Sequence, residues 1–257
     1  MRMLLERKSK IFLLLLIFAS ILAFRDSQKP TLYIIGDSTV RNNQPLYGWG
    51  SVIGTFFDST KIDMANHAMA GRSSRTFVTE GRWHKVDSLL KPGDFVMMQF
   101  GHNDGSIPDT TKKNRGTLKG IGEETKDLVW SDGRKETVHT YGWYIRKFIK
   151  DTKNKGGIPV VLSMIPRNEW KDGKVLRANE SFGKWAKEVA DQEGAYFIDL
   201  NQITADKYDQ MGPEKVKIFF PGDHTHTNKE GATINAASIV EGIKQIKDCP
   251  LNGFLSK

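Results

Sequence analysis

Residues 31–40 read TLYIIGDSTV, an apolar run that stops at a glycine, an aspartate and a serine. The apolar half is typical of a buried β-strand, because β-branched and aromatic side chains suit a pleated, covered surface. Gly36 ends the run, and Asp37 and Ser38 favour turns and helix starts. In open α/β sheets, ligands bind beyond the carboxyl ends of the strands. The stretch therefore predicts a functional serine at a strand end, with a serine that only caps the next helix as the alternative.

Short apolar segments alternate with helical stretches along the rest of the chain, which predicts a parallel sheet covered by helices on both faces. The predicted strands are 31–35, 61–66, 94–100, 159–165 and 195–200. The predicted helices are 82–90, 141–155, 178–193 and 228–246, and Thr227 with Glu230 predicts a capping box at the start of the last one. We therefore expect an α/β fold, a three-layer α/β/α sandwich around a five-stranded parallel sheet that is wound like flavodoxin.

The amino terminus has the pattern of a targeting segment. Four basic side chains in the first ten residues precede an apolar run at 11–24, which is shorter than the roughly 20 residues that cross a bilayer. We expect residues 1–23 to be a signal peptide, with an uncleaved membrane anchor as the alternative. The single cysteine, Cys249, excludes an internal disulfide, and export without disulfides fits a bacterial periplasm or exterior. Residues 24–257 are then expected to form one domain.

The basic residues do not indicate a nucleic-acid partner. The formal net charge is +8, but the lysines and arginines are spread along the chain and no nucleic-acid-binding module is recognisable. An exported basic protein would instead suit an acidic polymer. We expect a monomer whose membrane contact is limited to the amino-terminal segment.

A long connection follows the third predicted strand. Residues 105–139 contain few large apolar side chains, and 129–138 predict a small hairpin around Asp132 and Gly133. Loops of this length are uncommon in compact domains and are usually functional or mobile. This loop is expected over the same sheet edge as Ser38.

Polar groups gather at that edge, because all strands of a parallel sheet end on the same side. The segments that follow the strands are GDS at 36–38, NHAMAGRSSR at 66–75 and GHND at 101–104, and FFPGDHTHTN stands at 219–228. Together they hold what acyl transfer needs: a hydroxyl nucleophile, a base, an acid that orients the base, and donors for an oxyanion.

Each of these groups suggests a role. The backbone N–H of Ser38, the N–H of Gly71 and the side chain of Asn103 are candidate oxyanion donors, although Asn103 could also end its strand in an Asx turn. Asp223 and His226 are spaced so that the carboxylate can reach Nδ1 of the imidazole and turn Nε2 toward the serine. Asp223, His224 and His226 could alternatively bind a metal ion, but no further cluster of metal-ligand spacing supports this.

These segments resemble the four blocks of the GDSL or SGNH hydrolase superfamily: IIGDST, NHAMAGRSS, FGHND and DHTH. The resemblance implies that Ser38 is the nucleophile, His226 the base and Asp223 its orienting acid. It also places Gly71 and Asn103 beside the Ser38 amide in the oxyanion hole. Thr39 stands where the family commonly has leucine.

The branch that the chain resembles most is that of the rhamnogalacturonan acetylesterases, through YGWG, AGRSSRTF, EGRW and VHTYGWYIRKFI. That branch implies an exported esterase that removes O-acetyl groups from an acidic plant polysaccharide without a metal or organic cofactor. Candidate substrate-binding residues are Arg72, Arg75, Lys112 and Arg115, for galacturonate carboxylates, and Trp83, for stacking on a sugar ring. The alternatives are a solvated charged face for the basic residues and a place in the core for the tryptophan.

Two rival functions remain open. A lipid esterase or thioesterase would keep the same chemistry, but it should present an apolar slot for an acyl chain, whereas the loop at 105–139 is polar and glycine-rich. A carbohydrate-binding protein on a lapsed esterase fold is the second rival, although every catalytic element is present.

Overall fold

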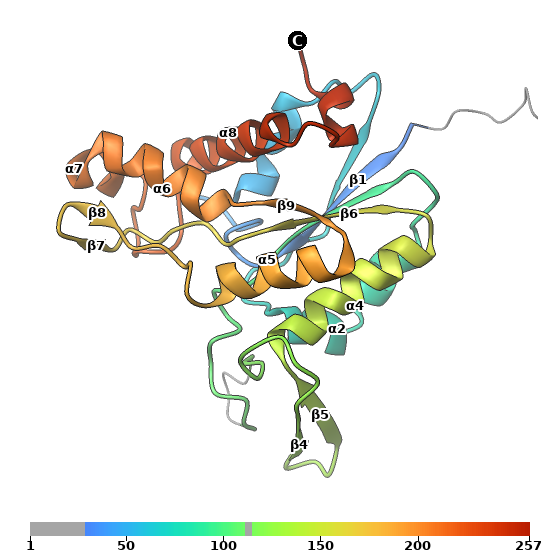
Figure 1. Ribbon diagram of the computed structural model, residues 1–257. Helices are drawn as coiled ribbons and strands as arrows, with labels where there is room; N and C mark the ends of the chain where they lie inside the picture. Colours follow the sequence, from blue (N-terminus) through green and yellow to red (C-terminus); the bar gives the residue numbers. More distant parts are fainter. Residues whose placement is uncertain (1–28, 111–114) are drawn as a thin grey trace, which may run out of the picture.

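A computed structural model of the chain describes residues 29–110 and 115–257. Five parallel strands form the central sheet in the order β2-β1-β3-β6-β9 (Figure 1). These are β1 (Thr31–Gly36), β2 (Asp63–Asn66), β3 (Phe95–Gln99), β6 (Ile158–Leu162) and β9 (Tyr196–Ile198). The five predicted strands are confirmed, and so is the flavodoxin-like winding, which places the first strand inside the sheet.

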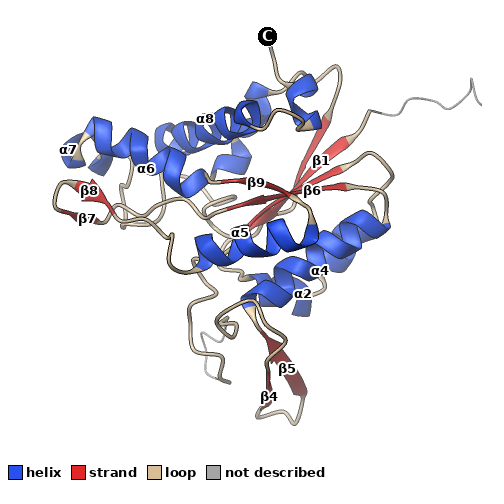
Figure 2. Ribbon diagram, viewed as in Figure 1, coloured by secondary structure: helices blue, strands red, loops and turns tan. Residues whose placement is uncertain are grey.

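Helices cover both faces of this sheet (Figure 2). One face is covered by α2 (Ser74–Thr79), α3 (Arg82–Asp87), α4 (Tyr141–Asn154) and α5 (Phe182–Glu193). The other is covered by α8 (Lys229–Gln245) and by the short 3-10 helices η1 (Trp49–Ser51), η2 (Ile53–Phe56) and η3 (Pro250–Phe254). The helices α6 (Leu200–Met211) and α7 (Pro213–Lys217) continue the layer of α8.

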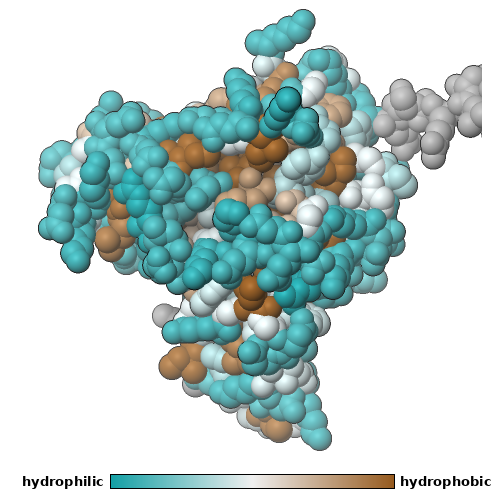
Figure 3. Space-filling model, viewed as in Figure 1, coloured by the Kyte–Doolittle hydropathy of each residue, from teal (hydrophilic) through white to brown (hydrophobic). Residues whose placement is uncertain are grey.

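The two faces have separate cores because successive strand residues point to opposite sides. In β1, Leu32 and Ile34 pack in the core beneath α8, whereas Tyr33 and Ile35 pack in the core beneath α4 and α5. The surface in Figure 3 is mostly hydrophilic, with hydrophobic atoms confined to separate patches. Burial on both faces explains why β1, β3 and β6 read as nearly continuous apolar runs, unlike the edge strand β2.

Two small antiparallel hairpins stand outside the sheet. The first pairs β4 (Thr125–Val129) with β5 (Lys135–His139) and projects away from the three layers near α2 and α4 (Figure 1). It confirms the hairpin around Asp132 and Gly133, although its strands are longer than predicted. The second pairs β7 (Trp170–Lys171) with β8 (Lys174–Val175) beside α6.

The turn after β1 differs from its prediction. No helix follows Ser38 directly; a single helical turn closes when the N–H of Arg41 donates to the carbonyl of Asp37 at 3.0 Å. Pro45 lies in the loop that follows, and the next helical residues are those of η1. Because proline disfavours a helical conformation in the residue before it, the helix does not continue.

The start of the last helix also differs. Asn228, not Thr227, is its N-cap and accepts a hydrogen bond from the N–H of Gly231 at 3.0 Å. The Thr227 hydroxyl instead donates to the carbonyl of Tyr47 at 3.0 Å, and the N–H of Tyr47 donates to the carbonyl of Thr227 at 2.8 Å. This Tyr47–Thr227 bridge joins the loop after β1 to the segment before α8.

The predicted signal peptide at 1–23 lies outside the described residues. Within residues 29–110 and 115–257, no helix has both the length and the apolar character needed to span a membrane.

Candidate active site

A buried chain of hydrogen bonds supports the turn that carries Ser38. The indole of Trp49 donates to Gln99 at 2.7 Å, and the amide of Gln99 donates to the Thr39 hydroxyl at 2.6 Å. The hydroxyl and backbone N–H of Thr39 both donate to Asp37 Oδ1, at 2.7 and 2.8 Å. Burial raises the pKa of Asp37 to about 6. These buried hydrogen bonds hold the turn in place, and the turn carries Ser38 just beyond the carboxyl end of β1.

Gly36 is required where β1 meets this turn. A Cβ at this position would lie 2.4 Å from Cγ2 of Val40 and 2.6 Å from the carbonyl oxygen of Gln99. Both distances are shorter than any real carbon contact, so a side chain would push β1 away from the turn or from β3. The glycine therefore keeps Ser38 close to the end of the sheet.

Ser38, His226 and Asp223 form a continuous hydrogen-bonded chain. His226 Nε2 lies 2.8 Å from Ser38 Oγ, and His226 Nδ1 lies 2.7 Å from Asp223 Oδ2. The other carboxylate oxygen accepts the backbone N–H groups of Thr225 and His226, at 2.7 and 2.8 Å. Partial burial opposes ionisation, but these hydrogen bonds outweigh it and lower the pKa of Asp223 to about 2. The carboxylate is thus ionised at neutral pH and can orient the imidazole as a proton acceptor for Ser38.

Candidate oxyanion donors lie in two adjoining loops. Asn103 donates from Nδ2 to the carbonyl of Arg72 at 2.9 Å, which joins the loop after β3 to the loop that holds Gly71. Gly71 has φ +79°, in the left-handed region that glycine tolerates. Neither its N–H nor that of Ser38 makes a hydrogen bond to another described residue. Both backbone donors, and the second amide proton of Asn103, are available to a ligand oxygen.

Two further ionisable side chains are buried behind these donors. Asp104 accepts hydrogen bonds from the backbone N–H and the hydroxyl of Ser74, and burial raises its pKa to about 7. Burial, with the nearby charge of Arg167, lowers the pKa of His102 to about 3. His102 is therefore neutral at physiological pH.

Two of the candidate substrate-binding residues are structural, so those predictions were wrong. The Arg75 side chain is only 1% exposed; it donates to Glu136 Oε1 at 2.7 Å and to the carbonyl of Gly116 at 2.9 Å. Trp83 is buried between α3 and α4, and its indole donates to Asp151 at 2.7 Å. Both side chains find partners inside the fold and present no surface to a polysaccharide.

Arg72 and Arg115 lie nearer the surface. Arg72 forms an ion pair with Glu80 at 2.9 Å and donates to the carbonyl of Ala70 at 3.0 Å. Arg115 donates to the carbonyl of Gly71 at 3.0 Å, so its guanidinium lies beside the candidate oxyanion donors. Lys112 falls outside the described residues.

A cavity of about 360 Å³ lies between the loop after β3 and the segment after β6. Gly101 and His102, which directly precede Asn103, form part of its wall, and Arg167 and Phe182 line other parts. Arg167 is a residue that the sequence reasoning missed, although it follows the fourth sheet strand just as the other polar groups follow theirs. Its Nη1 lies 3.1 Å from Nε2 of His224, in the same turn as Asp223 and His226.

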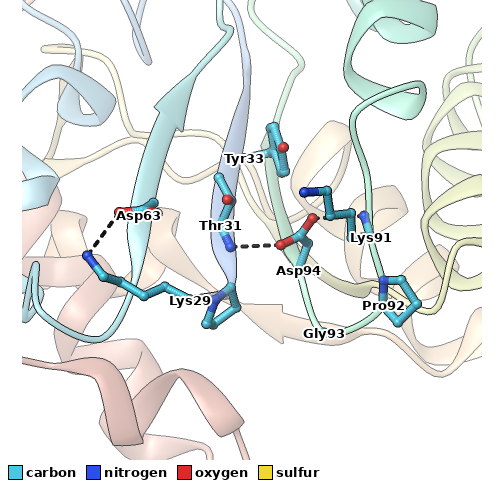
Figure 4. Close-up of a pocket in the computed structure, with 9 residues that line it drawn as sticks. Lys29, Thr31, Tyr33, Asp63, Lys91, Pro92, Gly93 and Asp94 are labelled. Atoms are coloured by element: carbon cyan, nitrogen blue, oxygen red, sulfur yellow. Dashed lines mark hydrogen bonds and ion pairs between the residues drawn. The ribbon is translucent and has the colours of Figure 1, made fainter. Parts of the chain in front are cut away.

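A larger cavity, about 690 Å³, lies at the opposite end of the sheet (Figure 4). It is lined by residues at the amino ends of three strands, among them Thr31 and Asp94. Asp94 accepts the backbone N–H of Thr31 at 2.8 Å, and Lys29 pairs with Asp63 at 3.5 Å. Because β1 lies between this cavity and Ser38, it is separate from the candidate active site.

The alternative of a metal site finds no support in the geometry. Within the described ranges, no group of three or more His, Cys, Asp or Glu side chains is placed to hold a metal ion. His224 and His226 point to different partners, Arg167 and Ser38.

Comparisons with known proteins agree with the motifs. The profile of the GDSL-like Lipase/Acylhydrolase family matches residues 34–234. A rhamnogalacturonan acetylesterase from Emericella nidulans is 34% identical over 213 residues, which cover 83% of this chain and 84% of that protein. The probable rhamnogalacturonan acetylesterase YesY from Bacillus subtilis is 30% identical over 225 residues, covering 84% of this chain and 93% of that protein.

Solved structures show the same fold. The crystal structure of YxiM from Bacillus subtilis superposes with a TM-score of 0.68 at 24% identity, over 85% of this chain and 57% of that one. An acetylxylan esterase from Geobacillus stearothermophilus superposes with a TM-score of 0.56 at 17% identity, over 83% of this chain and 93% of that one. With this fold and the match of the family profile over most of its length, the chain belongs to the GDSL-like lipase/acylhydrolase family and is a carboxylic ester hydrolase.

Proposed function

We propose that this chain is an exported serine esterase that removes O-acetyl groups from a plant cell-wall polysaccharide, with rhamnogalacturonan as its substrate. The hydrogen-bonded chain from Ser38 through His226 to Asp223 carries the proposal. The choice of substrate is supported by the similarity to rhamnogalacturonan acetylesterases over more than four fifths of the chain.

The proposed reaction is acyl transfer in two halves. His226 Nε2 accepts the Ser38 proton while Oγ attacks the acetyl carbonyl carbon. His226 then donates that proton to the departing sugar oxygen, which leaves an acetyl group on Ser38. In the second half His226 takes a proton from water, the hydroxide attacks the acetyl carbonyl, and acetate leaves as Ser38 recovers its proton. Asp223 stabilises the imidazolium that forms in each half.

The oxyanion of each tetrahedral intermediate needs donors that are already in place. The N–H groups of Ser38 and Gly71 and the amide of Asn103 are assigned this role, since none of the three is fully used within the fold. Loss of one such donor costs about 100- to 1,000-fold in kcat in comparable sites. Asn103 is the donor that a substitution can remove.

The surroundings of the site favour a sugar over a long acyl chain. The cavity whose wall includes Gly101 and His102 is also lined by apolar groups such as Phe182, together with two arginines and a glutamate. A long acyl chain would need a continuous apolar slot, because charged groups buried against hydrocarbon are costly. Sugars present apolar C–H faces and polar edges that suit such a mixed wall.

A panel of esters tests the proposal. The purified protein is given acetylated rhamnogalacturonan, acetylated homogalacturonan, acetylated xylan and a long-chain 4-nitrophenyl ester, and the released acid is measured. We expect the highest kcat/KM with acetylated rhamnogalacturonan. Ser38→Ala is expected to lower kcat by about 10⁴-fold or more, whereas Ser51→Ala, at an exposed serine on η1, leaves it unchanged.

Other outcomes would overturn the proposal in distinct ways. Activity confined to the long-chain ester would favour a lipid esterase. A preference for xylan would change the substrate and leave the chemistry intact. Binding of a polysaccharide without turnover of any ester would favour a carbohydrate-binding protein.

A further inference from the structure

Arg167 is held against the catalytic turn by the loop that follows β6. Its Nη1 lies 3.1 Å from His224 Nε2, and the backbone N–H of Asn168 donates to the carbonyl of His224 at 2.7 Å. His224 lies between Asp223 and His226 in the chain. The two contacts therefore place the Arg167 guanidinium beside the hydrogen-bonded chain of Ser38, His226 and Asp223.

The partner of Arg167 in this contact is a neutral acceptor. His224 Nδ1 lies 3.5 Å from Glu169 Oε1, so the ring carries its proton on Nδ1 and offers the lone pair of Nε2 to the guanidinium. Within the part of the chain that the structure describes, no carboxylate lies within ion-pair distance of Arg167. No carboxylate in the described ranges thus pairs with Arg167 directly, and Glu169, which lines the same cavity, contacts His224 instead.

Arg72, Arg75 and Arg177 differ in this respect. Arg75 pairs with Glu136 at 2.7 Å and Arg72 with Glu80 at 2.9 Å. Arg177, which lines the same cavity as Arg167, pairs with Asp206 at 2.6 Å and with Asp209 at 2.7 Å. Arg167 is therefore the cation of this cavity that remains available to an anionic ligand.

The cavity itself has the size and the wall of a sugar subsite. Its volume of about 360 Å³ falls within the range of about 300–1,000 Å³ that is usual for small-molecule sites. Met164, Leu176 and Phe182 supply an apolar wall for the C–H face of a sugar ring. Ser181 adds a hydroxyl that is not used to cap α5.

The cavity adjoins the loop that carries the candidate oxyanion donor Asn103. Gly101 and His102, in its wall, directly precede the candidate oxyanion donor Asn103. The charge of Arg167 also contributes, after burial, to the lowered pKa of His102, which shows that the guanidinium lies close to this wall. A sugar in the cavity would be a near neighbour of the one whose ester is attacked.

We propose that this cavity binds a uronate residue of the polysaccharide close to the acetylated sugar, and that the Arg167 guanidinium binds its carboxylate while His224 positions Arg167. The assignment rests on the proposed polysaccharide esterase function. A guanidinium presents parallel N–H groups that match the two oxygens of a carboxylate, so recognition would be bidentate. Selectivity for acidic polysaccharides then resides in Arg167 and not in Arg75, which is buried.

The test compares one acetylated rhamnogalacturonan oligosaccharide in two forms, with free carboxylates and with the carboxylates reduced to primary alcohols. The readout is the ratio of kcat/KM for the two forms, and each variant's rate with 4-nitrophenyl acetate serves as an internal standard for an intact Ser38–His226 pair. We expect the wild type to prefer the free carboxylate and Arg167→Gln to lower that ratio by about 10- to 100-fold, mainly through KM. Arg167→Lys should give an intermediate ratio, because lysine keeps the positive charge but lacks the two parallel N–H groups that bind both carboxylate oxygens.

Arg134→Gln is the matched control, since it removes one positive charge on the β4–β5 hairpin, where the side chain is 55% exposed. It should leave the ratio unchanged. Acetylated xylan with and without glucuronate branches forms a second arm, in which a similar dependence would show that the subsite accepts any uronate.

The outcomes separate this proposal from the one on which it rests. Equal turnover of both oligosaccharide forms by the wild type would leave the esterase function in place and overturn the carboxylate subsite. An Arg167→Gln loss of the same size on both forms and on 4-nitrophenyl acetate would show a structural role and also overturn it. No acetate release from either form by the wild type would contradict the proposed function, and the subsite with it.

Discussion

Two buried carboxyl groups, Asp37 and Asp104, lie beneath the reactive edge. Each has one oxygen hydrogen-bonded to neighbouring hydroxyl and N–H groups, and a second oxygen without a partner among the described residues. Burial raises the pKa of Asp37 to about 6 and that of Asp104 to about 7. Both groups hold protons more tightly in the native state than in the unfolded chain.

The raised pKa of Asp104 gives stability a defined pH dependence. Its contribution is fully present below the unfolded value of about 3.9 and is lost as the pH rises through about 7, because over this range the unfolded chain has released its proton while the native state still holds it. We expect Asp104→Asn to reduce the fall in unfolding free energy between about pH 4 and pH 7. Urea unfolding of wild type and variant across this range measures the difference.

Asp132→Asn is the control for this experiment, because its side chain is 65% exposed on the hairpin. It should reproduce the wild-type dependence. Parallel curves for the wild type and Asp104→Asn would show that Asp104 keeps an ordinary pKa in the native protein.

Single residues could be predicted from the sequence where they directly follow a strand. Predictions that rested only on the residue type, such as a basic side chain for binding substrate, were less reliable. Ser38 and Asn103 could be placed because the carboxyl ends of parallel strands share one edge. Arg75 was predicted to be a surface cation. Its partner Glu136 is 61 residues away, so the sequence around Arg75 contains no sign of a buried ion pair. Arg167 was not predicted, because an arginine after a strand is neither a nucleophile nor a base and so does not mark an acyl-transfer site.

The β4–β5 hairpin is fastened to the three-layer body through α2. Arg75, on α2, donates to Glu136, on β5, and to the carbonyl of Gly116. The side chains of Arg75 and Glu136 are 1% and 11% exposed. An ion pair this deeply buried ties the position of the hairpin to that of α2.

Loss of one partner of a buried pair is costly, because the other charge stays in a poorly solvating environment. We expect Glu136→Ala to lower the unfolding free energy by about 3 kcal/mol. Asp132→Ala, which removes one partner of an exposed pair in the same hairpin, should change it by less than about 0.5 kcal/mol. Chemical denaturation of both variants provides the comparison, and equal small effects would mean that the Arg75–Glu136 pair does not fasten the hairpin.

Elements with a strong apolar pattern were predictable and those without one were not. All five sheet strands were found from their apolar runs. The helix α6 was missed because its sequence, LNQITADKYDQM, has a weak amphipathic pattern: its buried face, which packs against α8, includes the polar residues Asn201 and Thr204. The capping box failed because the Tyr47–Thr227 bridge, a contact between distant segments, takes the Thr227 hydroxyl.

The carboxyl-terminal segment closes the core on the α8 side of the molecule. Leu251 on η3 is fully buried, and the ring of Phe254 lies 5.6 Å from that of Phe95 on β3. Asn252 also donates to the carbonyls of Ile243 and Ile246 at the end of α8. The last residues of the chain are thus part of the same core as the first strand.

Leu251→Ala should therefore destabilise the whole molecule. Removal of the side chain leaves a cavity in close-packed surroundings, for which we expect a loss of about 2–4 kcal/mol in unfolding free energy. Leu89→Ala, at a leucine that is 49% exposed, should stay within about 0.5 kcal/mol of wild type. Thermal and urea unfolding give both values, and similar losses for the two leucines would contradict the placement of η3 in the core.

The distance in sequence between Ser38 and His226 has a consequence for how the enzyme comes into being. The two residues are 188 positions apart in the chain, so the pair exists only after the ribosome has synthesised residue 226. A product that terminates before residue 226 contains Ser38 but lacks His226, which would deprotonate it, and is expected to show no esterase activity. Ester turnover is thus a signal that synthesis has passed His226.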